Sequence, residues 1–368
     1  MEEKILRSDE RIGYALRGLY DSYGYSRFKM GKFEPYELYL RNKDFLSGER
    51  MISFTDGDGQ LLALKPDVTI SIIKNTQDGD KGVRKVYYNE NVYRMAKGER
   101  HFQEIMQTGL ECVGEVDAYQ CFEVIFLAGR SLELISADYV LDISHMGLIT
   151  GLLERAGVPE EGFSAVLAAI REKNPTALTA QCKRLSLDSR GTALLQLLID
   201  LYGDMKSTLD LLEPYCGKSP AREALEELRV VEGLLRQNGM KNRIQLDFSV
   251  VNDMGYYNGI VFRGFIKGLS GGVLSGGQYD KLVEKMGKNF SAIGFAITLN
   301  ELSRLSPKNR PYDVDALILY DDSTPLEQLE AERVALHKAG KSALVQTEHG
   351  SAIHAERTID LRKGEGKR

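Results

Sequence analysis

Three short stretches of the chain carry polar groups whose types and spacing suit the binding of a small polar ligand. The first is the run LKPDVT at residues 64–69, which places an acid and a hydroxyl two residues apart. On an extended strand, Asp67 and Thr69 would face the same way and could together hold an ammonium group or an imidazole donor. The alternative is that the strand ends here and that Asp67 caps the helix that follows.

The second stretch begins at Arg94 and returns, through a charged turn that contains glycine, along a strand that reaches residue 111. This order predicts a hairpin with ligand contacts at its base. On the returning strand, Gln107, Gly109 and Glu111 lie two residues apart and therefore share one face. The glycine between two polar residues leaves room for a small ligand to lie against the backbone. A solvated outer face on an edge strand is the alternative.

The third stretch places two adjacent tyrosines, Tyr256 and Tyr257, between glycines, and a glycine-rich run at residues 268–277 follows. Two tyrosines side by side could enclose a flat ring such as imidazole, although a packed β-hairpin would use the same residues. The glycine run lacks the lysine of a phosphate-binding P-loop and the spacing of a dinucleotide fingerprint. We interpret it as turns and close packing of strands.

The elements that must position these residues predict an α+β chain. Helical spacing of apolar residues covers residues 8–23, the run CFEVIFLAGRSLELI and most of residues 159–240. Strand patterns occur in ISFTD, LLALKP, RKVYYNENVYRM, IQLDFSVV, YYNGIVFRGFI and GGVLSGG. After Pro311 comes one strand-helix-strand unit and a polar tail. We predict a core over residues 1–158, a helical insertion at 159–240, the rest of the core at 241–310 and a small C-terminal α/β unit at 311–368.

Composition excludes several classes of protein. The 368 residues are 43% hydrophobic, and no stretch has the leader or the long apolar run of a membrane protein, so we expect a cytoplasmic protein. The four cysteines are scattered, which predicts buried thiols, and neither cysteines nor histidines have metal-ligand spacing. We therefore expect no metal and no cofactor. A net charge of −5 argues against binding of a polyanion such as tRNA.

The order and spacing of the polar stretches, over about residues 8–305, resemble histidyl-tRNA synthetase. That family is a class II aminoacyl-tRNA synthetase, so the resemblance implies an antiparallel sheet flanked by helices. It also matches Arg94 to the arginine of class II motif 2, and the run SGGQYD at residues 275–280 to the family's glycine-rich strand. The histidine pocket that it implies consists of Asp67, Thr69, Arg94, Gln107, Glu111, Tyr256 and Tyr257.

The chain departs from the synthetase pattern where that family binds ATP. Asn252 stands where the histidine-specific loop has an arginine, Glu301 replaces the arginine that ends motif 3, and Gln278 replaces a further arginine. Positioned cations stabilise the negative charge that develops during adenylation, and losing one can cost about 100-fold in rate. A synthetase anticodon domain is also an α/β unit of roughly a hundred residues, which the chain after Pro311 cannot supply.

A retained histidine pocket without the ATP arginines resembles the regulatory subunits of ATP phosphoribosyltransferase. The resemblance implies a non-catalytic chain that pairs with the short-form catalytic subunit as a homodimer within a hetero-oligomer. L-histidine, the end product of the pathway, would bind the chain and shift the complex toward an inhibited state. The alternatives are an active histidyl-tRNA synthetase and a synthetase-like binding module that serves translation.

Overall fold

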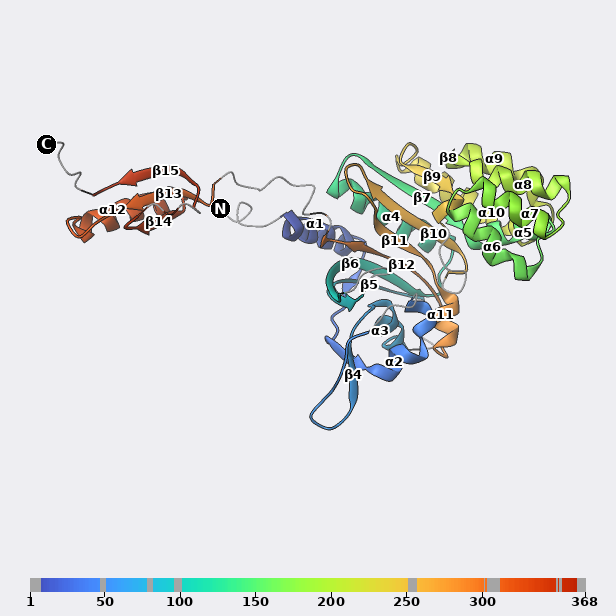
Figure 1. Cartoon of the computed structure of the whole chain (residues 1–368), viewed down its shortest axis with the longest axis horizontal. Coiled ribbons are helices and arrows are strands. Elements are labelled where there is room, and N and C mark those ends of the chain that lie inside the picture. The colour runs from blue at the N-terminus through green and yellow to red at the C-terminus, as the bar shows by residue number, and fades with distance from the viewer. Residues whose placement is uncertain are drawn as a thin grey trace. The chain divides into compact units, whose positions relative to one another are not determined.

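The computed structural model describes residues 8–46, 51–77, 82–95, 101–250, 257–300, 302, 312–348, 350 and 353–362. The chain divides into two compact units, one of residues 12–305 and one of residues 306–368 with residues 1–11. Figure 1 labels the elements of both units. In the described part, no helix is long and apolar enough to cross a bilayer. All four cysteines are buried free thiols, as predicted.

The larger unit is built on a nine-stranded sheet with the order β1-β5-β6-β12-β11-β10-β7-β9-β8. Most neighbours are antiparallel, as predicted, whereas β1 with β5 and β7 with β9 are parallel. The strands are β1 (Ser26–Arg27), β5 (Val83–Arg94), β6 (Gln103–Gly114), β7 (Tyr139–His145), β8 (Tyr202–Asp204), β9 (Ile244–Asp247), β10 (Ile260–Ile266), β11 (Gly272–Gln278) and β12 (Ser291–Thr298).

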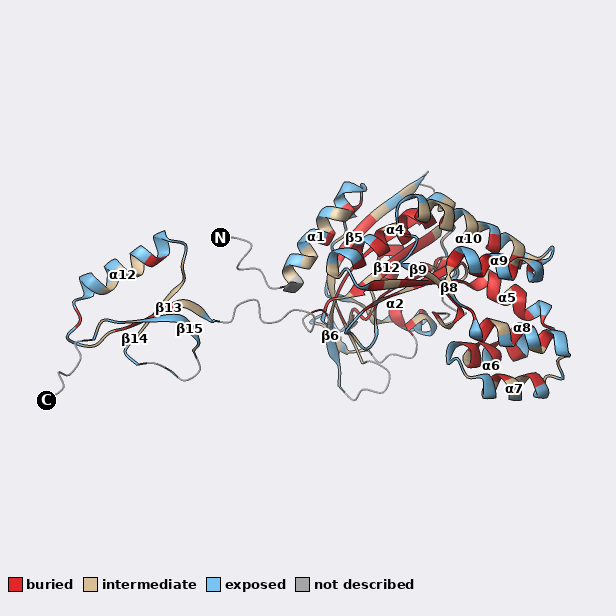
Figure 2. Ribbon diagram, turned by 90° about the horizontal axis from the view of Figure 1, so that it is seen from above, coloured by how far each residue is buried: buried red, intermediate tan, exposed pale blue. Residues whose placement is uncertain are grey.

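One face of this sheet carries the largest hydrophobic core, and two smaller hydrophobic clusters lie on the other face. Helix α4 (Ala118–Ile135) begins at a capping box in which the Asp117 side chain accepts hydrogen bonds from the backbone of Tyr119 and Gln120. The buried residues of α4 form one core with alternate residues of the strands, such as Leu110 and Phe295. Figure 2 shows buried residues concentrated on α4 and the central strands.

The residues between these core positions point to the opposite face, which we call the polar face. The β6–β12 register sets Glu111 opposite Gly294, and the β12–β11 register sets Gly294 opposite Gly277. Residues directly opposite one another in a sheet project from the same side. Gln107, Gly109 and Glu111 therefore share the polar face, as their spacing predicted.

The remaining elements of the larger unit lie around the sheet. Helix α1 (Ser8–Ser22) matches the predicted N-terminal helix. A second sheet has the order β2-β4-β3. Its strands and the other helices are β2 (Phe33–Pro35), β3 (Ser53–Thr55), β4 (Leu61–Leu64), α2 (Tyr36–Arg41), α3 (Thr69–Lys74), α5 (Met146–Arg155), α6 (Glu160–Arg171), α7 (Pro175–Arg184), α8 (Ser189–Asp200), α9 (Met205–Cys216), α10 (Pro220–Gln237) and α11 (Asp280–Lys285), with short 3₁₀ helices η2 (Lys43–Leu46) and η3 (Phe248–Val250).

Two predicted segments contain strands that their sequences did not indicate. The stretch predicted to be helical contributes β8, which pairs with β9 at the edge of the main sheet. The smaller unit contains β13 (Val314–Leu319), α12 (Leu326–Lys338), β14 (Ala343–Gln346) and β15 (Ala355–Asp360), in a parallel sheet with the order β14-β13-β15. The run AERTID of β15 has few apolar residues, so it gave no strand signal.

Candidate functional site

The polar face holds a buried carboxyl group, that of Glu111, at its centre. The Glu111 residue is 2% exposed. Its Oε1 accepts a hydrogen bond from Thr69 Oγ1 at 2.9 Å, and its Oε2 accepts one from Tyr279 Oη at 2.5 Å. Gly294 on the next strand makes the space, because a Cβ there would lie 1.6 Å from Glu111 Oε2. The glycine is therefore needed for the Glu111 side chain to lie across β12.

A second carboxyl group, that of Asp67, acts electrostatically on the first. Burial raises the pKa of Glu111 to about 8, the hydrogen bonds from Tyr279 and Thr69 oppose this rise, and the charge of Asp67 adds to it. Burial also raises the pKa of Asp67, against the hydrogen bond from the Ile70 backbone and the positive charge of Arg94. Two carboxyl groups that share a buried site are stabilised by a ligand that brings positive charge.

The structure corrects the predicted geometry of Asp67 and Thr69. Strand β4 ends at Leu64, and Thr69 is the first residue of α3, so the two side chains do not share a strand face. Asp67 Oδ1 instead accepts a hydrogen bond from the backbone N–H of Ile70 at 2.8 Å. The first N–H groups of a helix have no partner within the helix, which is why an acid is favoured here. Asp67 thus bonds the first turn of α3, as the capping alternative predicted, although the N-cap residue is Val68, and Thr69 still reaches Glu111.

The prediction for Gly109 was wrong in one respect. No space for a ligand lies against this glycine, because a Cβ there would be 2.2 Å from Phe295 O and 2.7 Å from the Tyr88 hydroxyl. The residue is glycine because a neighbouring tyrosine lies over it. Sequence reasoning had not named Tyr88 or Tyr279. Tyr279 stands within the SGGQYD run, so the family resemblance offered a signal for it.

Arg94 and Gln107 lie on neighbouring strands, β5 and β6, of the main sheet. Arg94 ends β5, and its positive charge lowers the pKa of Asp67. Gln107 is buried on the polar face, opposite Glu90 of β5 and Thr298 of β12 in the strand registers. The carboxylate of Glu90 is held by the buried ammonium group of Lys65 at 2.5 Å.

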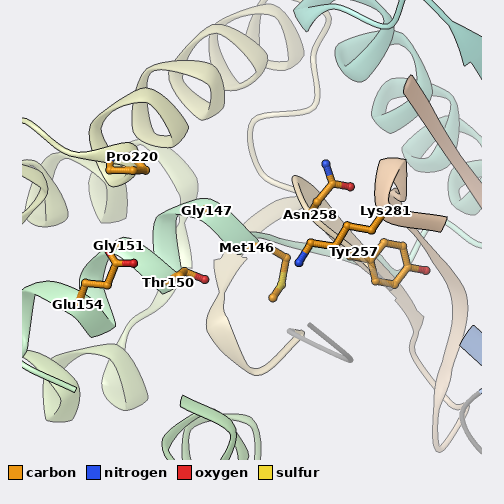
Figure 3. Close-up of a pocket in the computed structure, with 9 residues that line it drawn as sticks. All are labelled: Met146, Gly147, Thr150, Gly151, Glu154, Pro220, Tyr257, Asn258 and Lys281. Carbon is orange, nitrogen blue, oxygen red and sulfur yellow. The ribbon is translucent and has the colours of Figure 1, made fainter. Parts of the chain in front are cut away.

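Tyr257 lies over the polar face at β11. A Cβ on Gly277 would lie 2.7 Å from the Tyr257 ring, so the ring covers that glycine. Burial, together with the charges of Glu111 and Asp67, raises the pKa of Tyr257. Tyr257 also lines a pocket with a volume of about 230 Å³, together with Met146, Thr150, Glu154 and Lys281. Figure 3 shows the Lys281 side chain extending toward Met146 across this pocket.

Three predicted positions, Tyr256, Asn252 and Glu301, lie outside the described residues. Gln278, which stands where the synthetase has an arginine, faces the core side of β11. Its Oε1 accepts a hydrogen bond from the Ile260 backbone at 2.7 Å. Gly259 leaves the space for it, because a Cβ there would lie 1.8 Å from Gln278 Oε1. The side chain thus ties β11 to β10 and points away from Glu111.

Comparison with known proteins gives the family. The family model for histidyl-tRNA synthetase matches residues 2–302. The chain belongs to the histidyl-tRNA synthetase family. The resemblance and the fold class inferred from the sequence are thereby confirmed. A relative from Oceanobacillus iheyensis named ATP phosphoribosyltransferase regulatory subunit is 28% identical over 345 residues, which is 92% of this chain and 84% of that protein.

Solved structures share the fold. The crystal structure of an ATP phosphoribosyltransferase regulatory subunit/histidyl-tRNA synthetase from Bacillus halodurans has a TM-score of 0.76 and 22% identity, and the match covers 97% of this chain and 94% of that one. A chain of the ATP phosphoribosyl transferase (HisG:HisZ) complex from Thermotoga maritima has a TM-score of 0.61 and 19% identity, covering 78% and 96%.

Proposed function

We propose that this chain is the regulatory subunit of a cytoplasmic ATP phosphoribosyltransferase and that it binds free L-histidine in the pocket around Glu111. The choice of ligand rests on the buried Glu111 carboxyl group. Two hydroxyl groups hold it, and a second carboxyl group, that of Asp67, lies beside it. Such a pair is suited to an α-ammonium group. The Tyr257 ring, with Tyr256 beside it in the sequence, supplies an aromatic wall for imidazole.

The relatives support the regulatory role. Those similar over about nine-tenths of this chain bear the name of the regulatory subunit. The Thermotoga maritima protein with the same fold was solved in a HisG:HisZ complex. We accordingly propose that a short-form catalytic subunit is the partner, with this chain as a homodimer within the hetero-oligomer.

We also propose that the chain does not form histidyl-adenylate. Arg94 remains at the end of β5, but Asn252 and Glu301 replace two arginines of the synthetase pattern. A carboxylate close to a triphosphate raises the energy of the complex, whereas a cation lowers it. Gln278 has a neutral side chain whose Oε1 accepts a hydrogen bond from the β10 backbone, so it supplies no replacement cation.

Calorimetric titration of the purified chain with histidine, and separately with ATP, tests the proposal. We expect saturable histidine binding at micromolar to low millimolar affinity and no ATP binding. Glu111→Gln should weaken histidine at least tenfold, because it removes the charge that pairs with the ammonium group. Glu115→Gln is the matched control, since Glu115 is exposed just beyond β6. Histidine-dependent pyrophosphate exchange, or unchanged affinity in Glu111→Gln, would contradict the proposal.

A further inference from the structure

A second group of polar side chains lies on the polar face at the far edge of the sheet. Figure 1 shows β7, β9 and β8 beside the helices α5–α10. The β7–β9 register sets Asp142 opposite Gln245, so both face the same way, and Ser144 and Asp247 are the next residues of these strands on that face. Across the sheet, Ser144 pairs with Val261, Val261 with Gly277, Gly277 with Gly294, and Gly294 with Glu111, so Ser144 and Glu111 face the same side. Four strand spacings, roughly 19 Å, separate this group from the Glu111 pocket.

Two buried oxygen atoms in this group have no hydrogen-bond partner among the residues that the structure describes. They are Asp142 Oδ1 and Ser144 Oγ, and their residues are 6% and 0% exposed. The two side chains project from positions two residues apart on β7, about 7 Å along the strand, and do not hydrogen-bond to each other. Buried polar atoms in native proteins nearly always have a partner, which can be a bound ion or water.

Two carboxyl groups and one ammonium group lie around these oxygens. Asp247 is satisfied, because Lys173 Nζ donates to its Oδ2 at 3.0 Å and the Ser249 backbone donates to its Oδ1 at 2.8 Å. Asp142 has no ion pair among the described residues. Burial and the charge of Asp247 raise the pKa of Asp142 to about 7, and the charge of Lys173 opposes this rise. When Asp142 is ionised, a bound cation would neutralise its charge.

We propose that a monovalent cation, K⁺ or Na⁺, binds between the side chains of Asp142 and Ser144. Carboxylate and hydroxyl oxygens are ligands for hard cations. The described residues contain no group of three or more His, Cys, Asp or Glu side chains that could hold a metal ion. This composition disfavours Ca²⁺ and Zn²⁺, which collect several carboxylate, imidazole or thiolate ligands. Gln245, beside Asp142, offers a further oxygen.

Thermal unfolding of the full chain in KCl or NaCl, against tetramethylammonium chloride at equal ionic strength, tests the proposal without histidine. The bulky organic cation controls for screening. A ligand present at ten times its dissociation constant should raise the unfolding midpoint by about 2–4 °C in a unit of this size. The rise should saturate and should be lost in Asp142→Asn and in Ser144→Ala. Asp138→Asn, an exposed acid before β7, should keep it.

Equal midpoints in the alkali and organic salts, or an undiminished alkali effect in Asp142→Asn, would overturn the proposal. If Asp142→Asn does not fold, crystals of the unmodified chain grown in RbCl decide the matter. An anomalous peak for rubidium between Asp142 and Ser144 is the expected result. A buried water at that place, with no anomalous signal, would overturn it. Neither outcome depends on histidine binding, so the proposed function is tested separately.

Discussion

The raised pKa of Glu111 predicts that histidine binding releases a proton. Burial raises this pKa to about 8, so at pH 7 the protonated and ionised forms stand at about ten to one in the free chain. The ammonium group of a bound amino acid favours the ionised form. Binding at pH 7 should therefore release about 0.9 proton from Glu111. Relative affinity should rise nearly tenfold per pH unit from pH 6 and level off above pH 8.

Calorimetry in two buffers of different ionisation enthalpy counts these protons. The difference between the apparent binding enthalpies, divided by the difference between the buffer ionisation enthalpies, is the number of protons exchanged. Glu111→Gln keeps the shape of the side chain but has no proton to release. The imidazole of the ligand titrates in both proteins, so the comparison with the variant isolates the Glu111 contribution.

The result has a clear refutation. If the unmodified chain and Glu111→Gln exchange the same number of protons while both bind histidine, Glu111 does not ionise on binding. The electrostatic account of the pocket would then be wrong.

Four further predictions follow from single contacts. Gly294→Ala should reduce histidine affinity at least tenfold by calorimetry, because the new Cβ displaces Glu111, whereas Gly271→Ala, with open space around it, should not. Glu111 should lower the stability of the free chain in urea by up to about 1.4 kcal/mol per pH unit as pH rises from its unfolded pKa to about 8, since the folded state binds the extra proton. Glu111→Gln should remove this contribution and leave that of the other buried carboxyl groups, Asp67 and Asp142. Lys65→Met should cost about 2–4 kcal/mol in urea unfolding because it leaves the partly buried Glu90 carboxylate without its partner, and adding Glu90→Gln should restore part of that loss. Asp117→Ala should cost about 1 kcal/mol through loss of the α4 cap and leave histidine affinity unchanged.

The two-residue periodicity of a strand correctly predicted the part of the site that lies on the single strand β6. The two-residue spacing of Gln107, Gly109 and Glu111 put them on one face, and the β6 registers agree. The same reasoning failed at residues 67–69. An acid and a hydroxyl two residues apart suit both an extended strand and a helix start, and only the position of α3 decides between them.

Local sequence patterns could not predict contacts between distant parts of the chain. Tyr279 and Glu111 are 168 positions apart, and their hydrogen bond depends on the order of strands in the sheet. Gly109 is covered by Tyr88 for the same reason. Asp142 and Ser144 gave no signal in the sequence. They stand out only because the fold buries them without a hydrogen-bond partner for Asp142 Oδ1 and Ser144 Oγ among the described residues.

The most direct test of the regulatory role is the rate at which a short-form ATP phosphoribosyltransferase catalytic subunit forms phosphoribosyl-ATP with and without this chain, across a histidine titration. We predict that the chain raises the rate, that histidine lowers it in a saturable way, and that Glu111→Gln shifts the histidine response to at least tenfold higher concentration. A rate that does not depend on the chain, or a histidine response that Glu111→Gln leaves in place, would contradict the proposed function.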